Sequence, residues 1–519
     1  MRTKAIATIL IAVAVTLAAA PLWAATWDGT VKLGGTILDE TGDLSAVQET
    51  YNVYEGFSVA QVRVNGTLDP RRYFSFDLRD INQSSRAGDL VFRVPGTFKF
   101  TAGYDQNRQV FDPVRGVNSF RKDWKAGAQV TPNRWLNLSG SLNYLTRDGA
   151  RLAYPTGTAS VLGARYDNTL KAGEVTADVQ KGRRGGGISF RMSDYSDALA
   201  SAAKRSGQVV SARCYAPTPF YDKWTHMVRA AYGTRKLSDS DIEWTMADVR
   251  YTGIVQPLDV YRIKYSFGAD RVDDKATRLK TDRFQNDLDA TWYHPYGDVS
   301  AGAGYEMNDD DRSLTSYKSW RLGTSLHYKQ LTSARVDYAS RVKQDQEELT
   351  LLKDIESSQV RAKFQLQPMP RVVVGGSYQE RERELTDLHV TANGKSTGAF
   401  GRYTYEGWGA ASADYSYAND EYRDLAGGFR ASSQAVTGRV DFSRIKNLTL
   451  AGGVTFLKLG KDLDIEKSMV FAEGNCRLLD GYHLEVKYNV YNYDDYVLLN
   501  RYYTANVVRI NLAYDFHSK

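Results

Sequence analysis

Residues 506–516 read NVVRINLAYDF and alternate between two kinds of side chain. Apolar residues take every second position, namely Val508, Ile510, Leu512, Tyr514 and Phe516. The residues between them are Arg509, Asn511, Ala513 and Asp515. Because successive side chains of a strand point to opposite faces, one face suits hydrocarbon and the other suits water. The length fits a tilted span of a bilayer, so the stretch predicts the closing strand of an outer-membrane β-barrel.

The N-terminus predicts export from the cytoplasm. Arg2 and Lys4 precede an apolar stretch from Ala5 to Ala20, and small residues follow at Ala24 and Ala25. This is the pattern of a secretory signal peptide over residues 1–24, which leaves residues 25–519 as the barrel. The alternative, a membrane anchor, needs a longer apolar run. The predicted location is the bacterial outer membrane.

Composition agrees with a barrel and excludes several other classes of protein. The chain has 519 residues, of which 12% are aromatic, and 34 are Tyr. Its mean hydropathy is −0.46. After the signal, no stretch approaches the roughly 18 apolar residues of a membrane helix. The formal charge of +6 is too small for a chain of this size to indicate nucleic-acid binding.

One unit repeats along the chain: an alternating strand, a tight turn and a second alternating strand. In the clearest case, residues 360–367 alternate, Pro368–Arg371 form the turn, and the chain returns from Val372. Pro and Asn favour the dihedral angles of such turns. Further turns are predicted at Asp69–Arg72, Val94–Thr97, Thr131–Arg134, Val255–Leu258, His294–Gly297, Glu406–Gly409 and Lys446–Asn447. The longer, more polar segments are predicted to be extracellular loops, namely Ala150–Asp167, Asp194–Trp224, Asp270–Thr281 and Glu380–Ser396.

Counting these units gives about 25 strands, and single-chain barrels use even numbers. We therefore expect an all-β, antiparallel transmembrane barrel of about 24–26 strands, with short periplasmic turns and longer extracellular loops. A further strand at Gln208–Tyr215 would bring the count to 26. The alternative fold is a soluble β-sandwich or propeller. A barrel of this size is wide enough to enclose a protein.

An N-terminal stretch of the chain resembles a known family. The likeness lies in Tyr51–Gly56, the strand Ser58–Gly66, Asp69-Pro70 and the stretch Gly96–Asp105. These segments are similar to the start of MtrB/PioB-type barrels, the porin members of porin–cytochrome conduits. The resemblance covers about a fifth of the chain, and the N-terminal CxxC of some members is absent.

The resemblance implies a sheath for electron transfer. A periplasmic multihaem c-type cytochrome would occupy the lumen, and an extracellular cytochrome would dock outside. The haem would belong to the partner, because the chain lacks the CxxCH attachment motif, and we expect no cofactor to bind the chain directly. Inward residues would form the polar wall facing that partner, the candidates being Asp178, Arg191, Arg262, Lys264, Arg361, Lys363 and Asp414.

Two other functions compete with the sheath. In a passive or substrate-selective porin, the same inward charges would set ion or solute preference, and Asp194–Trp224 would fold inward to narrow the channel. An outer-membrane enzyme is not favoured, because no serine lies in a GxSxG elbow and the six His show no metal-ligand spacing.

Four smaller features complete the sequence-based predictions. Cys214, in a predicted loop, and Cys476, in a predicted strand, are read as isolated thiols. Asn308–Asp311 offers oxygen ligands for Ca²⁺ without full EF-hand spacing. Glu380–Glu384 alternates charge at an extracellular strand end and suggests a docking surface. Six tyrosines near the final hairpin are predicted to form an interfacial girdle rather than electron-hopping sites, namely Tyr488, Tyr491, Tyr493, Tyr496, Tyr502 and Tyr503.

Overall fold

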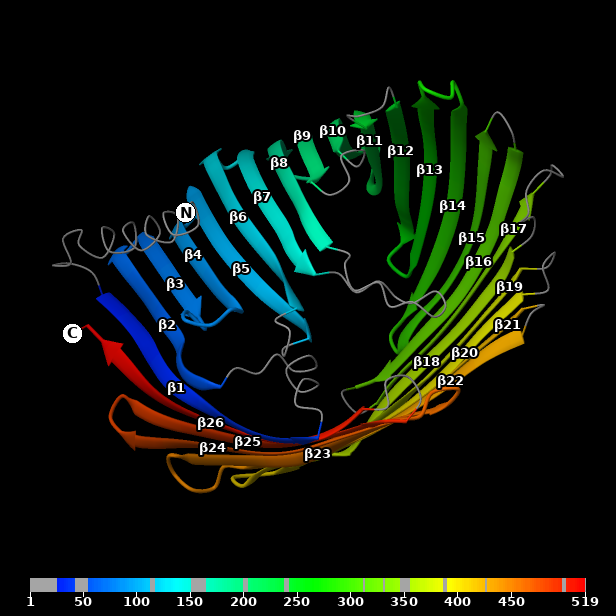
Figure 1. Cartoon of the computed structure of the whole chain (residues 1–519). Coiled ribbons are helices and arrows are strands. Elements are labelled where there is room, and N and C mark those ends of the chain that lie inside the picture. The colour runs from blue at the N-terminus through cyan, green and yellow to red at the C-terminus, as the bar shows by residue number, and fades with distance from the viewer. Residues whose placement is uncertain are drawn as a thin grey trace.

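The chain forms one closed antiparallel sheet. The computed structural model describes residues 26–42, 55–112, 117–150, 165–198, 204–237, 242–310, 313–329, 332–345, 355–385, 390–424, 427–496 and 501–518. These residues contain 26 strands, each paired with its neighbours in sequence (Figure 1). None of the described residues forms a helix that is long and apolar enough to cross a membrane. The predicted signal peptide lies outside the described residues.

The strands follow one another without a crossover. Their bounds are β1 Thr26–Gly42, β2 Gly56–Asp69, β3 Arg72–Arg79, β4 Arg86–Val94, β5 Phe98–Asp112, β6 Val117–Asn133, β7 Leu136–Ala150, β8 Arg165–Lys181, β9 Arg184–Asp197, β10 Arg205–Thr218, β11 Tyr221–Leu237, β12 Glu243–Leu258, β13 Tyr261–Asp274, β14 Lys280–His294, β15 Gly297–Asp310, β16 Ser313–Tyr328, β17 Thr332–Asp345, β18 Ile355–Met369, β19 Val372–Leu385, β20 Val390–Tyr405, β21 Gly409–Asp424, β22 Gly427–Phe442, β23 Leu448–Lys461, β24 Ile465–Leu479, β25 Tyr482–Asp495 and β26 Arg501–His517.

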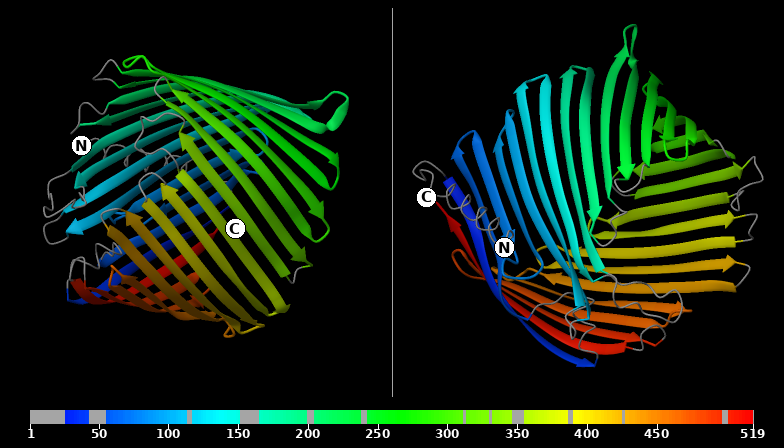
Figure 2. Two further views of the ribbon diagram at one scale, coloured as in Figure 1. Left: turned by 90° about the vertical axis from the view of Figure 1, so that its right-hand side faces the viewer. Right: turned by 45° about the horizontal axis from the view of Figure 1, so that its top comes forward.

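The first and last strands close the barrel. β1 and β26 pair in register from Asp28 opposite His517 to Gly42 opposite Tyr503. They lie side by side in Figure 1, the first in blue and the last in red. The two further views show the tilted strands running around a common axis (Figure 2). Closure leaves no unpaired sheet edge, which satisfies the backbone hydrogen bonds that a bilayer cannot supply. The predicted fold and the upper value of the predicted strand count are confirmed.

The two ends of the barrel have connections of different length. The connections that follow the even-numbered strands, from β2–β3 to β24–β25, lie at one end. The longest of them joins β22 to β23 and has five residues, 443–447. At the other end, residues 43–55 join β1 to β2 and residues 151–164 join β7 to β8. By the usual asymmetry the short-turn end is periplasmic. At Thr131–Arg134 and Val255–Leu258 the strands run further than predicted, and the turns fall at 134–135 and 259–260.

Three of the predicted extracellular loops are largely strand. Within Asp194–Trp224, the described residues form the end of β9, the whole of β10 and the start of β11, and residues 199–203 lie outside the described part. β10 is the strand suspected at Gln208–Tyr215, so this segment supplies no long infolded loop. Its alternation is weak because Val209 and Val210 face opposite sides of the wall. Asp270–Thr281 and Glu380–Ser396 are likewise shortened by β13, β14, β19 and β20, and residues 386–389 are outside the described part.

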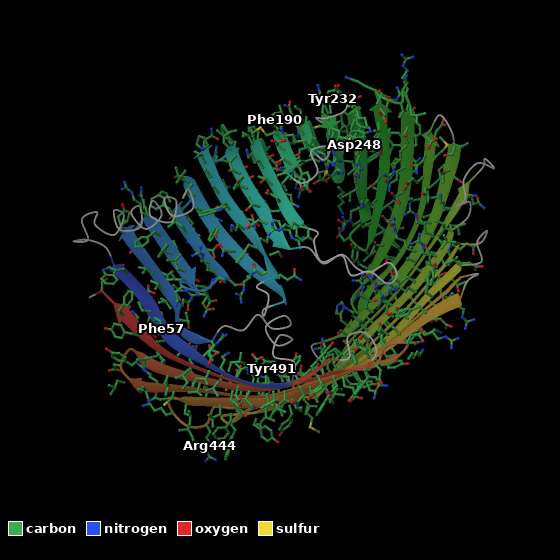
Figure 3. All side chains as sticks on the ribbon, viewed as in Figure 1. Phe57, Phe190, Tyr232, Asp248, Arg444 and Tyr491 are labelled. Carbon is green, nitrogen blue, oxygen red and sulfur yellow. The ribbon has the colours of Figure 1, made fainter. Side chains whose placement is uncertain are left out.

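The register separates a lipid face from a lumen face. Phe190, Val210 and Tyr232 are opposite one another on β9, β10 and β11, so their side chains share one face. Figure 3 shows Phe190 and Tyr232 on the outside of the barrel, and Asp248 and Tyr491 on the inside. Large apolar side chains on the outer face are well exposed, including Leu288 at 50%. The surrounding lipid would cover them.

The tyrosine prediction is wrong for three of the six residues. Tyr491, Tyr493 and Tyr503 lie on the inner face, where Tyr503 is 2% exposed and its ring stacks on Tyr493 at 5.2 Å. Together with Ala505 and Val507 they make a buried apolar cluster on the lumen side of β25 and β26. The residue numbers of the inner and outer tyrosines differ by an odd number, so alternation sends them to opposite faces although they are close in sequence. Tyr488 and Tyr502 face outward and are exposed, as an interfacial girdle requires.

Candidate functional site

The candidate site is the inner wall of the barrel. The seven predicted wall residues come from β8, β9, β13, β18 and β21. Register pairings place all seven on the face that carries Asp248 and Tyr491. For example, Lys264 is opposite Asp289, and Asp337 is opposite Arg361. The side chains therefore share the lumen face, although they are distributed around the wall and do not form one cluster.

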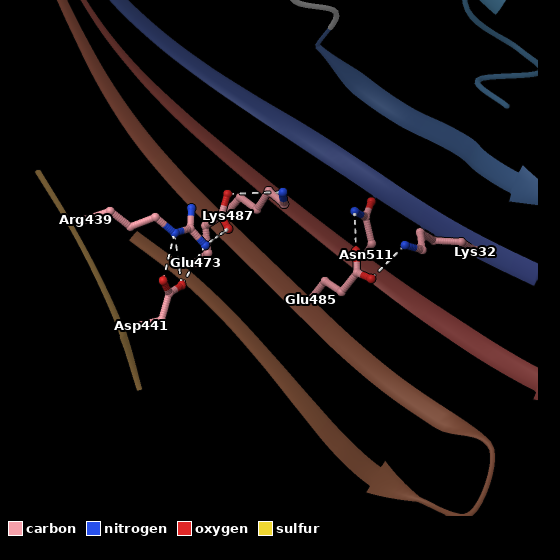
Figure 4. Close-up of polar contacts among 7 residues, drawn as sticks. All are labelled: Lys32, Arg439, Asp441, Glu473, Glu485, Lys487 and Asn511. Carbon is pink, nitrogen blue, oxygen red and sulfur yellow. Dashed lines mark hydrogen bonds and ion pairs between the residues drawn. The ribbon is translucent and has the colours of Figure 1, made fainter. Parts of the chain in front are cut away.

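Charges in one part of this wall neutralise one another. Arg439 on β22 lies 2.8 Å from Asp441 and 3.8 Å from Glu473, which also accepts a hydrogen bond from Lys487 at 3.2 Å. Lys32 on β1 donates to Glu485 at 2.7 Å (Figure 4). These pairs span β22 to β1. Each is partly exposed, so its contribution to stability is small, and its main effect is to leave this wall nearly neutral.

The opposite part of the wall carries cations without such partners. Among the predicted residues, Asp178 forms an ion pair with Arg213 at 2.7 Å. Within the described chain, no ion pair is formed by the five cationic candidates Arg191, Arg262, Lys264, Arg361 and Lys363. β13 and β18 therefore present to the lumen cations that form no ion pair within the described residues.

A hollow opens in the wall over β14 to β22. Its volume is about 910 Å³. The depression arises because small inward residues lie between long ones on neighbouring strands. Ser319 on β16 and Ser357 on β18 flank Arg341 on β17, and Ser357 and Ala392 flank Arg383 on β19. Arginine side chains thus have room on either side.

Three arginines of this hollow, Arg283, Arg321 and Arg341, pair with carboxylates that are less exposed than they are. Glu306 on β15 is bridged by Arg283 at 3.0 Å and by Arg341 at 3.3 Å. Its side chain is only 13% exposed, whereas that of Arg341 is 51% exposed. The carboxylate therefore lies deeper in the wall than the two guanidinium groups with which it pairs.

The second row of the hollow repeats this arrangement. Arg321 on β16 lies 2.8 Å from Asp289 and 3.4 Å from Asp287 on β14, and Asp287 is 17% exposed. Aromatic rings complete the lining, with Arg341 lying 4.2 Å from the centroid of Tyr317. The surface presented to the lumen is thus a set of oriented guanidinium groups beside aromatic rings.

Sequence reasoning missed this hollow, although it placed one of its segments, Glu380–Glu384, at a strand end as the structure does. Glu380–Glu384 belongs to β19, and strand alternation sends Arg381 and Arg383 inward while the three glutamates face out. The alternation of Arg with Glu in that segment is the signal that could have been used. The partners from β14 to β18 are distant in sequence, and only the register brings them together.

Comparison with known proteins supports the fold and its location. No family model matches the chain, and no curated protein matches it. Among solved structures, the siderophore receptor PirA from Acinetobacter baumannii is 8% identical with a TM-score of 0.55, over 94% of this chain and 80% of that one. The FrpB iron transporter from Neisseria meningitidis (F3-3 variant) is 10% identical with a TM-score of 0.52, over 95% of this chain and 81% of that one.

The protein is an outer-membrane β-barrel. At such low identity the likeness concerns the fold alone, and the matched receptors are longer than this chain. The closed antiparallel sheet, the apolar outer face and these neighbours together locate the barrel in a bacterial outer membrane. The resemblance to conduit barrels stays a prediction, since no comparison bears on it.

The remaining predicted features do not form a site in the described chain. Cys214 and Cys476 are free thiols, and Cys214 lies in β10 rather than in a loop. Asp310 caps the start of β16 by accepting a hydrogen bond from the Ser313 amide at 2.7 Å, and Asp311 lies outside the described residues. No group of three or more His, Cys, Asp or Glu side chains with metal-binding geometry occurs among the described residues.

Proposed function

We propose that this barrel is the outer-membrane sheath of a porin–cytochrome conduit, with a multihaem c-type cytochrome held in its lumen. The observation that carries the proposal is the 26-strand closed wall. Strands about 4.8 Å apart and tilted about 40° give a circular barrel roughly 50 Å across. A compact domain of about 100 residues has a radius of gyration near 13 Å and thus a diameter of roughly 34 Å.

The size of the barrel favours an enclosed partner over an open pore. Barrels of about 22 strands already hold a folded plug. In this chain, the described residues are almost entirely strands and short connections, and they form no separate folded unit within the lumen. An open passage of this width would release periplasmic contents. A partner polypeptide is the simplest occupant.

The inner wall supplies the contacts that such a partner requires. Haem carried by the cytochrome would transfer the electrons, and the barrel would keep it away from lipid. The chain's own residues would orient the partner: the uncompensated cations of β13 and β18 attract an acidic surface, whereas the neutralised wall from β22 to β1 does not. Charge complementarity of this kind fixes the rotation of the partner within the barrel.

A second candidate is a solute-selective porin. The same uncompensated cations favour it, because inward Arg and Lys side chains select for anions. However, the segment Asp194–Trp224, which would have narrowed the channel, forms strands. Constriction would therefore have to come from elsewhere.

The deciding experiment is purification of the tagged barrel from its native outer membrane, followed by haem staining and an absorbance spectrum. The conduit proposal expects a c-type cytochrome in stoichiometric amount. A matched pair of variants tests the wall: Arg361→Gln with Lys363→Gln should reduce cytochrome retention at moderate salt, and Arg63→Gln on β2 should not. A haem-free barrel that conducts anions in planar bilayers would contradict the conduit and support the porin.

A further inference from the structure

We infer that the hollow over β14 to β22 is a binding site for a small molecule bearing two or more carboxylate or phosphate groups. The inference goes beyond the proposed conduit and does not depend on it, because the hollow is a recess in the wall itself. Its volume of about 910 Å³ lies in the range of small-molecule pockets.

The spacing of the cations suits a multivalent anion. Arg341 and Arg383 lie on β17 and β19, with Ser357 of β18 opposite both. Two strand spacings separate their backbones by roughly 10 Å. Arg381 lies two residues from Arg383, about 7 Å along the strand, and is paired with Asp420 at 3.3 Å. Guanidinium groups at these separations can each engage a different acidic group of one ligand, in the bidentate geometry that carboxylate and phosphate prefer.

The guanidinium groups are held in place before any ligand arrives. Glu306 fixes Arg283 and Arg341, and Asp287 with Asp289 fixes Arg321. These carboxylates are less exposed than the arginines, so they orient the guanidinium groups from within the wall and reduce the entropy lost on binding. Arg383 is exposed and forms no ion pair within the described residues, and it is the cation most available to an anion.

The lining also favours a small ligand over a flat protein surface. Gly304, Ser319 and Ala392 form part of the lining, and Tyr422 and Phe429 line its β21–β22 side. A concave recess with small residues and rings encloses a compact molecule, whereas a protein docked along the lumen would contact the higher parts of the wall. Rings beside guanidinium groups additionally suit a ligand with a planar portion.

The test uses the full-length barrel, purified in detergent without its partner, and isothermal titration with citrate and separately with pyrophosphate at low salt. We expect saturable binding of at least one probe at one site per barrel, weakening as salt is raised. The variant Arg341→Gln with Arg383→Gln should weaken it about tenfold or more, because hydrogen bonds between charged partners are stronger than those between neutral ones. Arg63→Gln is the matched control and should bind as the unmodified barrel does.

Each outcome is decisive when circular dichroism and heat-modifiable gel migration show that the variants are folded. Binding of citrate but not of pyrophosphate identifies a site for carboxylates. Binding of pyrophosphate but not of citrate identifies a site for phosphates. The inference is overturned if neither probe binds at millimolar concentration. It is also overturned if the double variant binds a probe as tightly as the unmodified barrel does. If neither probe binds but the double variant loses its cytochrome, the hollow docks the partner instead. Because the titration involves no cytochrome, it can fail while the conduit proposal stands.

Discussion

Replacement of Leu288 by Arg tests the assignment of the two faces most directly. Leu288 lies on the outer face of β14 and is 50% exposed. It is six residues from His294 at the short-turn end, which is about 20 Å along the strand at 3.4 Å per residue. With a tilt of about 45°, this corresponds to a depth of roughly 14 Å, close to the centre of an apolar band about 25 Å tall.

At that depth an arginine side chain must leave water for hydrocarbon. The expected loss is about 2–4 kcal/mol in the free energy of unfolding. The matched control is Ser266→Arg on β13, which lies opposite Asp287 on the inner face. The new guanidinium there would face a hydrated wall with a carboxylate beside it, so we expect a change below about 1 kcal/mol.

The assay is urea unfolding of each variant refolded into lipid vesicles, followed by tryptophan fluorescence. Equal losses for the two variants would refute the face assignment, and with it the lumen position of every candidate residue. A loss below 1 kcal/mol for Leu288→Arg alone would show that this part of β14 does not contact hydrocarbon.

Three further predictions concern packing, turns and surface charge. Tyr503→Ala should cost about 3–5 kcal/mol because it empties a buried position, whereas Tyr502→Ala, at a residue 67% exposed, should cost much less; the same urea titration compares them. Gly297→Ala should destabilise the barrel by more than about 1 kcal/mol, because φ is 151° and an added Cβ would meet the Ser325 carbonyl oxygen. The control is Gly401→Ala, where φ is not positive and the space around the Cβ position is open. Equal losses of stability for the two variants would contradict the reasoning. The Lys223 ammonium lies 2.9 Å from Asp259 in the β12–β13 turn and holds the pKa of that carboxyl below its usual 3.8. The ion pair therefore stabilises the fold above pH 3.8, and this stabilisation is lost as the pH falls through the lowered pKa of Asp259. Lys223→Gln should therefore lower the melting temperature slightly at pH 7 and leave it unchanged in strong acid, as thermal unfolding at both pH values would show.

The sequence was sufficient to determine the class of fold. The alternation in residues 506–516 identified the closing strand, and the same period in successive hairpins gave the number of strands to within two. The two-residue repeat can be recognised in the sequence because one face of each strand contacts lipid and the other contacts water. Apolar and polar side chains therefore alternate along the strand. The pattern was weakest at β10, which the sequence only suggested at Gln208–Tyr215, because Val209 and Val210 face opposite sides and the contrast between faces is small.

The tertiary structure alone decided which charges meet. Arg283 and Arg341 share Glu306 because β14, β15, β16 and β17 are joined in one specific register. A shift of one residue in any of those pairings would send a whole strand's charges to the lipid. The same register sorts Tyr503 from Tyr502 and Arg381 from Glu382. Alternation within a strand is a local property that can be read from the sequence. The register between neighbouring strands depends on closing all 26 strands around one axis. The hollow therefore exists only in the folded barrel.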